Sequence, residues 1–116
     1  MPAESPLAPC GPTPNCYRVS RTFAGPPDTV FAEAEQAVRD LGGLTVGRAT
    51  VLERNGQREL HATFRVLFFT DDLHLRVDPD GPGSVLHVRS ASRTGRSDLG
   101  VNRRRVEALL RALQAA

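Results

Sequence analysis

The sequence predicts an α+β domain, in which an antiparallel sheet packs both of its helices on one face in the order β-α-β-β-β-β-α. Three observations lead to this fold class. Apolar and polar residues alternate in five segments, which is typical of half-buried strands. Two other segments space their apolar residues as one face of a helix does. Glycine, proline and asparagine clusters separate these segments, and short turns favour antiparallel neighbours.

The first strand is expected at residues 17–23, where Tyr17, Val19 and Phe23 fit the alternation. A helix follows from Gly25-Pro-Pro-Asp28, because proline is tolerated in the first helical turn and aspartate favours the positive end of the helix dipole. Gly42-Gly43 is expected to end this helix. Its buried face is predicted to hold Val30, Ala34, Ala37, Val38 and Leu41.

The four strands that follow are expected at residues 45–54, 58–67, 72–78 and 84–93. Asn55-Gly56 is a strong signal for a two-residue hairpin. The predicted inward residues are Leu60, Ala62, Phe64, Val66, Leu73, Leu75, Val77, Leu86 and Val88.

The turn at Asp80-Gly-Pro-Gly83 sets the pairing of the last two strands. A register that joins Asp78 to Gly83 would place His74 opposite His87 and Asp72 opposite Arg89.

The last helix is predicted to start near Asp98, whose carboxylate would cap it. Its expected buried stripe is Leu99, Val106, Leu109, Leu110 and Leu113. Asn102 interrupts this stripe at a position where leucine is expected. A buried amide must be hydrogen-bonded, so Asn102 either satisfies backbone groups at the corner between strand and helix or lines a pocket.

The length of 116 residues indicates one domain. Five prolines in residues 1–14 predict a flexible N-terminal segment, and residues 15–116 are expected to form the domain. No apolar run is long enough for a membrane helix, and the N-terminal residues lack signal-peptide features. A cytoplasmic location is therefore expected, with Cys10 and Cys16 as free thiols and no metal bound to them.

Charge points to a local site. Residues 89–105 hold six arginines and one aspartate, a net charge of +5, although the whole chain has only +2. Such a patch predicts a small polar or anionic ligand or a protein partner near the corner between Arg89 and Asn102. The candidate binding residues are Asn15, Cys16, Asp71, Asp72, Arg89, Ser90, Ser92, Arg93, Ser97, Asp98, Asn102 and Arg103.

The sequence also bears on metal binding, nucleic-acid binding and catalysis. His61, His74 and His87 share the predicted polar face of the sheet, but the arginines beside them would repel a cation, so neither a metal nor another cofactor is expected. Nucleic acid is disfavoured, because one tyrosine, five phenylalanines and no tryptophan offer no stacking platform. An enzyme that uses Cys16 as a nucleophile, with a nearby histidine and aspartate, is the alternative to a binding module.

Three stretches resemble the family called domain of unknown function 1499. They are Cys10–Cys16 with the strand that follows, Phe69–Leu75, and above all Arg89–Val106, and together the resemblance spans roughly residues 10–113. The family pattern usually has Val-Ser-Ser where this chain has Tyr17-Arg18-Val19. The resemblance implies a shared domain, found in bacteria and in plastid-bearing eukaryotes, and no established reaction. The order of elements is also similar to TATA-binding-protein-like and helix-grip folds.

Overall fold

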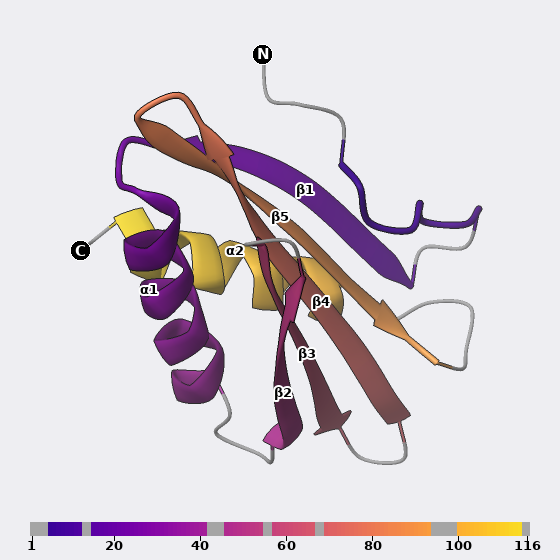
Figure 1. Ribbon diagram of the computed structural model, residues 1–116. Helices are drawn as coiled ribbons and strands as arrows, with labels where there is room; N and C mark the ends of the chain where they lie inside the picture. Colours follow the sequence, from indigo (N-terminus) through magenta and orange to yellow (C-terminus); the bar gives the residue numbers. More distant parts are fainter. Residues whose placement is uncertain are drawn as a thin grey trace.

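Five strands form a single antiparallel sheet in the spatial order β1-β5-β4-β3-β2. The computed structural model describes residues 5–12, 15–41, 46–54, 57–66, 69–93 and 100–114. Its elements are β1 (Cys16–Phe23), α1 (Pro27–Asp40), β2 (Val46–Arg54), β3 (Gln57–Val66), β4 (Phe69–Asp80), β5 (Gly83–Ser92) and α2 (Val101–Gln114). Both helices pack on one face of the sheet (Figure 1), so the predicted fold class is confirmed.

The core lies between the sheet and the two helices, and we call the face of the sheet that meets the helices the inner face. Alternate residues of β3, β4 and β5 point inward, as the period of two predicts. Leu60, Leu75 and Val88 are fully buried there, and Val38 and Val106 meet them from α1 and α2. The predicted stripes of both helices are confirmed for every described residue except Leu41, which is only partly buried.

The register of β4 and β5 differs from the prediction by two residues. Asp80 is paired with Gly83, so the turn has two residues, and Gly81 adopts a φ of 57° within it. Glycine suits such a tight hairpin turn because it has no Cβ to clash at positive φ. His74 therefore lies opposite Arg89, and Asp72 lies opposite Ala91. An even shift leaves every side chain on its predicted face.

Helix α2 begins at Val101, three residues after the predicted start. Gly100 precedes it with a φ of 81° and accepts the backbone hydrogen bond of Arg104 at 3.0 Å. The predicted cap Asp98, the candidate Ser97 and the stripe residue Leu99 lie outside the described residues. Neither described helix is long and apolar enough to cross a membrane.

The N-terminal segment lies beside β1 (Figure 1). Leu7 is only 4% exposed, and its carbonyl accepts a hydrogen bond of 3.0 Å from Arg18 Nη1 on β1. Flexibility of residues 1–14 stays a prediction, but two attachments hold the described part: this contact and a bond between Cys10 and Cys16.

Candidate functional site

The predicted corner is divided between the two faces of the sheet. Arg89 is on the outer face of β5, whereas Ser90 and Ser92 point to the inner face, where they meet Asn102 of α2. Successive side chains of a strand alternate between faces, so residues adjacent in sequence cannot share one binding surface here. The candidates therefore form two separate groups.

The first group, which we call the inner cluster, consists of Asp71, Ser90, Ser92, Asn102 and Arg105. Asn102 is 1% exposed and lies at its centre. Its Oδ1 accepts hydrogen bonds from Ser90 Oγ at 2.6 Å and from Arg105 Nη1 at 2.8 Å. Its Nδ2 donates to Ser92 Oγ at 3.0 Å and to the carbonyl of Asn15 at 3.2 Å. The amide thus joins α2, β5 and the residue before β1.

Arg105 completes the inner cluster. Its Nη2 donates to Asp71 Oδ2 at 2.9 Å, its Nη1 donates to Ser90 Oγ at 3.0 Å, and its guanidinium lies 4.5 Å from the ring centre of Phe64. The side chains of Arg105 and Asp71 are only 8% and 2% exposed. Sequence reasoning missed Arg105, although it follows Asn102 by three residues, a spacing that puts both side chains on one helical face.

The inner cluster holds the fold together and leaves its polar groups little access to solvent. Asp71, Ser90 and Asn102 are each at most 2% exposed. Buried polar groups bonded to one another in this way specify a unique packing. This geometry confirms that Asn102 bonds the chain where strand meets helix. The backbone group that it satisfies is nevertheless the carbonyl of Asn15 rather than one in the turn before α2.

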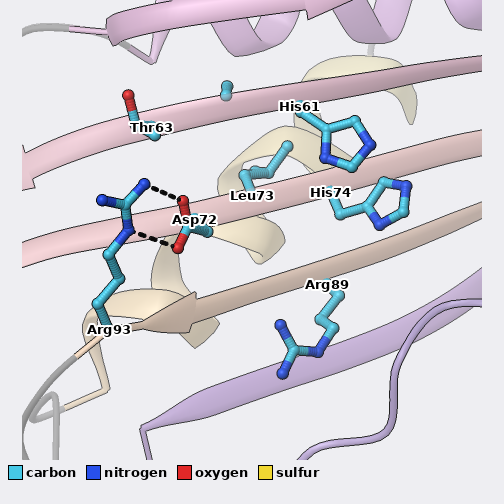
Figure 2. A pocket seen from close by; sticks show the side chains of 8 residues that line it. His61, Thr63, Asp72, Leu73, His74, Arg89 and Arg93 are labelled. Atoms are coloured by element: carbon cyan, nitrogen blue, oxygen red, sulfur yellow. Dashed lines mark hydrogen bonds and ion pairs between the residues drawn. The ribbon is translucent and has the colours of Figure 1, made fainter. Parts of the chain in front are cut away.

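The second group lines a depression of about 370 Å³ on the outer face, which we call the outer depression. Strands β3, β4 and β5 contribute its walls (Figure 2). The lining residues are His61, Ala62, Thr63, Asp72, Leu73, His74, Arg89 and Arg93.

Asp72 and Arg93 form a bidentate pair at one end of the outer depression (Figure 2). Arg93 Nε and Nη2 donate to the two carboxylate oxygens at 2.8 and 2.9 Å, and the hydrogen bonds and charge of Asp72 raise the pKa of Arg93. The prediction that Asp72 pairs with Arg89 is therefore wrong. The two-residue turn moves Arg89 opposite His74 and leaves Asp72 free to bind Arg93.

Arg89 makes no bond to the other residues drawn in Figure 2. Its Nε is buried and has no hydrogen-bond partner among the described residues. Arg18 of β1 lies directly opposite it in the ladder. Two like charges facing each other across a strand pair are unfavourable unless something neutralises them.

His87 is the buried member of the three outer-face histidines, at 1% exposure. Its Nδ1 shares a 2.6 Å hydrogen bond with Ser20 Oγ, and its Nε2 lies 3.5 Å from Asp78 Oδ2. Burial lowers the pKa of His87, and Arg76 lowers it further, while Asp78 opposes both. His61 and His74 lie apart from it, stacked with their ring centres 3.9 Å apart.

The expectation of free thiols is wrong, because Cys10 and Cys16 form a disulfide with a Cα–Cα distance of 5.6 Å. That distance is within the ordinary range for disulfides. The expectation depended on an assumed reducing compartment, not on geometry. With its sulfur bonded, Cys16 has no thiolate to act as a nucleophile.

Arg103 is an exposed residue of α2 that lies in neither group. Its Nε donates to Glu107 Oε1 at 2.7 Å, and its guanidinium lies 5.7 Å from the ring centre of Tyr17. Both of these contacts of the Arg103 guanidinium lie on the helix side of the sheet.

The model of a family described as "Protein of unknown function (DUF1499)" matches residues 6–113. This match covers most of the chain and confirms the resemblance expected from the motifs. No curated protein sequence is similar enough to match this chain.

Several solved structures share the fold. Protein CV1439 from Chromobacterium violaceum has a TM-score of 0.53 at 12% identity, covering 88% of this chain and 96% of that chain. Mll3558 from Rhizobium loti has a TM-score of 0.52 at 19% identity, covering 86% and 94%. CalU16 from Micromonospora echinospora has a TM-score of 0.51 at 15% identity, covering 84% and 75%. These similarities agree with the expected helix-grip architecture and show the fold alone.

Proposed function

The chain belongs to the DUF1499 family, and because that family is described only as proteins of unknown function, we propose a function from the site itself. The domain is a non-enzymatic module that binds a small polar or anionic ligand in the outer depression. The observation that carries this proposal is Arg89, whose buried Nε has no hydrogen-bond partner among the described residues. A carboxylate or phosphate oxygen is the partner that such a donor binds best.

Charge around Arg89 supports an anion in particular. Arg18 faces Arg89 across the strand pair and gives one of its donors to the carbonyl of Leu7, a neutral acceptor. Asp72, the carboxylate within the outer depression, is already held by both donors of Arg93. A bound anion would offset the positive charge that these pairings leave behind.

A small molecule suits the space better than a protein partner does. The outer depression is at the small end of the range for ligand pockets. The inner cluster is the poorer candidate, because its groups are buried and, apart from Asp71 Oδ1, which has no hydrogen-bond partner among the described residues, bonded to one another. Of the site predicted between Arg89 and Asn102, we therefore propose only the residues that line the outer depression, which include Arg89 and Arg93.

Location bears on which ligands are available. A cytoplasmic location stays a prediction, and the disulfide between Cys10 and Cys16 speaks against it. Disulfides persist in oxidising compartments and are rare in the reducing cytosol. We therefore favour a ligand met outside the cytosol.

Isothermal titration of the protein with sodium phosphate and with sodium succinate, in the absence of added metal ions, tests the proposal. We expect one binding site and a loss of about tenfold or more in affinity for Arg89→Gln, the size of a lost charged hydrogen bond. Arg111→Gln removes the same charge from an exposed position on α2 and should bind as the wild type does. Equal weakening in both variants would mean that the anion only senses net charge, and the proposal would fail.

A further inference from the structure

Two histidines and a glutamate converge on the outer face next to Arg89. Glu59 and His61 are alternate residues of β3, and His74 lies directly opposite His61 on β4. One ligand atom from each of these three side chains lies within 4.8 Å of the other two. All three residues lie on the paired strands β3 and β4, so the sheet itself brings their side chains together.

The distances suit a transition metal. Bonds of about 2.0–2.1 Å in tetrahedral geometry set neighbouring ligand atoms about 3.4 Å apart. His74 Nε2 and Glu59 Oε1 are already 3.5 Å apart. His61 lies within 4.8 Å of both other ligand atoms, so its exposed side chain must rotate out of its stack with His74 to approach by at most about 1.4 Å. His74 Nε2 is buried and makes no hydrogen bond to the described residues; its contact with Glu59 is the 3.5 Å ion pair.

We propose that Glu59, His61 and His74 form a binding site for a divalent transition metal ion of the zinc type, with remaining positions open to solvent. Two imidazoles and one carboxylate are a donor set that zinc commonly takes when it keeps an open position. The proposal does not rest on anion binding at Arg89.

Protonation favours the metal. Imidazole binds metals in its neutral form. Burial lowers the pKa of His74, and the neighbouring His61 and Arg89 lower it further, while Glu59 opposes them. This direction favours the neutral imidazole that a metal binds.

Repulsion from arginines, the reason for not expecting a metal from the sequence, is reduced at two of the arginines on this face by carboxylate partners. Arg93 is paired with Asp72, and Arg76 donates to Asp78 at 2.7 Å. Arg89 is the cation that acts directly on His74, and Glu59 acts on it with the opposite sign. Sequence reasoning considered His61, His74 and His87 and expected no metal, and it missed Glu59, which the structure places beside His61 and His74.

Zinc titration of the untagged protein tests this site with little interference. The chain has two cysteines and both are in the disulfide, so no thiol competes for the metal. We expect zinc chloride to bind one to one in phosphate-free buffer. His61→Ala, His74→Ala and Glu59→Gln should each weaken binding. For the histidines we expect about 100-fold or more, since even partners of ligands account for 10–100-fold.

Arg65→Ala is the matched control, because Arg65 is exposed on the same strand and face as His61. It should bind zinc at least as tightly as the wild type. His61 is exposed, so its variant will fold even if the His74 variant does not. Wild-type affinity in His61→Ala and Glu59→Gln, or binding lost equally in Arg65→Ala, would overturn the proposal.

Arg89→Gln separates this inference from the proposed function. Removing a like charge should tighten zinc binding by severalfold, whereas the same variant should weaken phosphate binding to the metal-free protein. Phosphate binding without zinc binding overturns the metal site alone. Zinc binding without phosphate binding overturns the anion site alone.

Discussion

Asp71 and Asp72 are neighbours in the sequence, and each binds an arginine through its carboxylate, yet the two pairs differ in nearly every physical respect. Asp71 points to the inner face, where it and Arg105 are 2% and 8% exposed. Asp72 points to the outer face, where it and Arg93 are 46% and 55% exposed. The first pair is almost completely shielded from solvent, and about half of each side chain in the second pair is open to solvent.

The difference separates buried polar residues that hold the fold together from polar residues that face the outer depression. Inner-face groups bond one another and fix how α2 meets the sheet. Outer-face groups line a depression between β3, β4 and β5. Identical chemistry thus serves folding on one face and is available for binding on the other.

Asp71→Ala should have the largest effect on stability. It leaves the guanidinium of Arg105 buried without its carboxylate, and breaking a buried pair in this way costs about 3–5 kcal/mol. Urea denaturation measures the loss. A change below about 1 kcal/mol would mean that the inner pair behaves like an exposed one and would remove the contrast between the faces.

Asn102→Leu should destabilise the protein by about 1–3 kcal/mol, despite adding an apolar, helix-favouring side chain. Leucine cannot bind Ser90, Ser92 or the carbonyl of Asn15, all of which Asn102 contacts. Urea denaturation measures the loss in the free energy of unfolding, and a thermal melt measures the change in melting temperature. A higher melting temperature would instead indicate that Asn102 is kept for binding at some cost to stability.

Replacing Cys10 and Cys16 by serine should lower the free energy of unfolding by about 2 kcal/mol under oxidising conditions, as expected for so short a loop. In reducing buffer the wild type and the variant should coincide. A variant as stable as the oxidised wild type would show that the disulfide does not stabilise the fold.

Stability should fall as pH falls below about 6.5. The folded-state pKa values of His74 and His87 are lowered. As the pH falls, the unfolded chain therefore binds protons before the folded protein does, and this stabilises the unfolded chain. The contribution of these histidines to the free energy of unfolding is complete above their unfolded-state pKa, and it is lost as the pH falls through their lower folded-state pKa values. Urea midpoints at pH 7.5 and 5.5 measure this drop, and His87→Gln should reduce it. A midpoint that rises on acidification would contradict the sign.

Asp72→Ala should have the smallest effect, with a urea midpoint indistinguishable from that of the wild type, since exposed pairs add little. Chemical shifts of the outer-face amides should nevertheless change, because Arg93 is released. A loss comparable with that of Asp71→Ala would show that burial does not distinguish the two pairs.

Local patterns were enough to predict the inward residues of β3, β4 and β5 whose burial is described. Leu73, Leu75 and Val77 alternate within one strand, and no distant information is needed to place them. The register of β4 and β5 was missed by two residues, because alternation is unchanged by an even shift and the conformation of Gly81 decides the turn.

The partners within the site depended on packing that sequence does not encode locally. Asp71 was expected as a site residue, but the sequence does not show that its partner is Arg105, because that pair forms only where α2 packs against the sheet. The disulfide was missed because compartment, not spacing, was used to decide it. Glu59 joined His61 and His74 only once the register of β3 and β4 was known.

The place of β1 at the edge of the sheet has a consequence for the order of folding. Strands β2, β3 and β4 each pair with the next strand along the chain, as local hairpins. Strand β1 instead pairs with β5, and the contact between Ser20 and His87 spans 67 residues. Closing so long a loop loses more chain entropy than closing a hairpin. We therefore expect β1 to dock after the rate-limiting step, so that substitutions in it accelerate unfolding and leave the folding rate nearly unchanged.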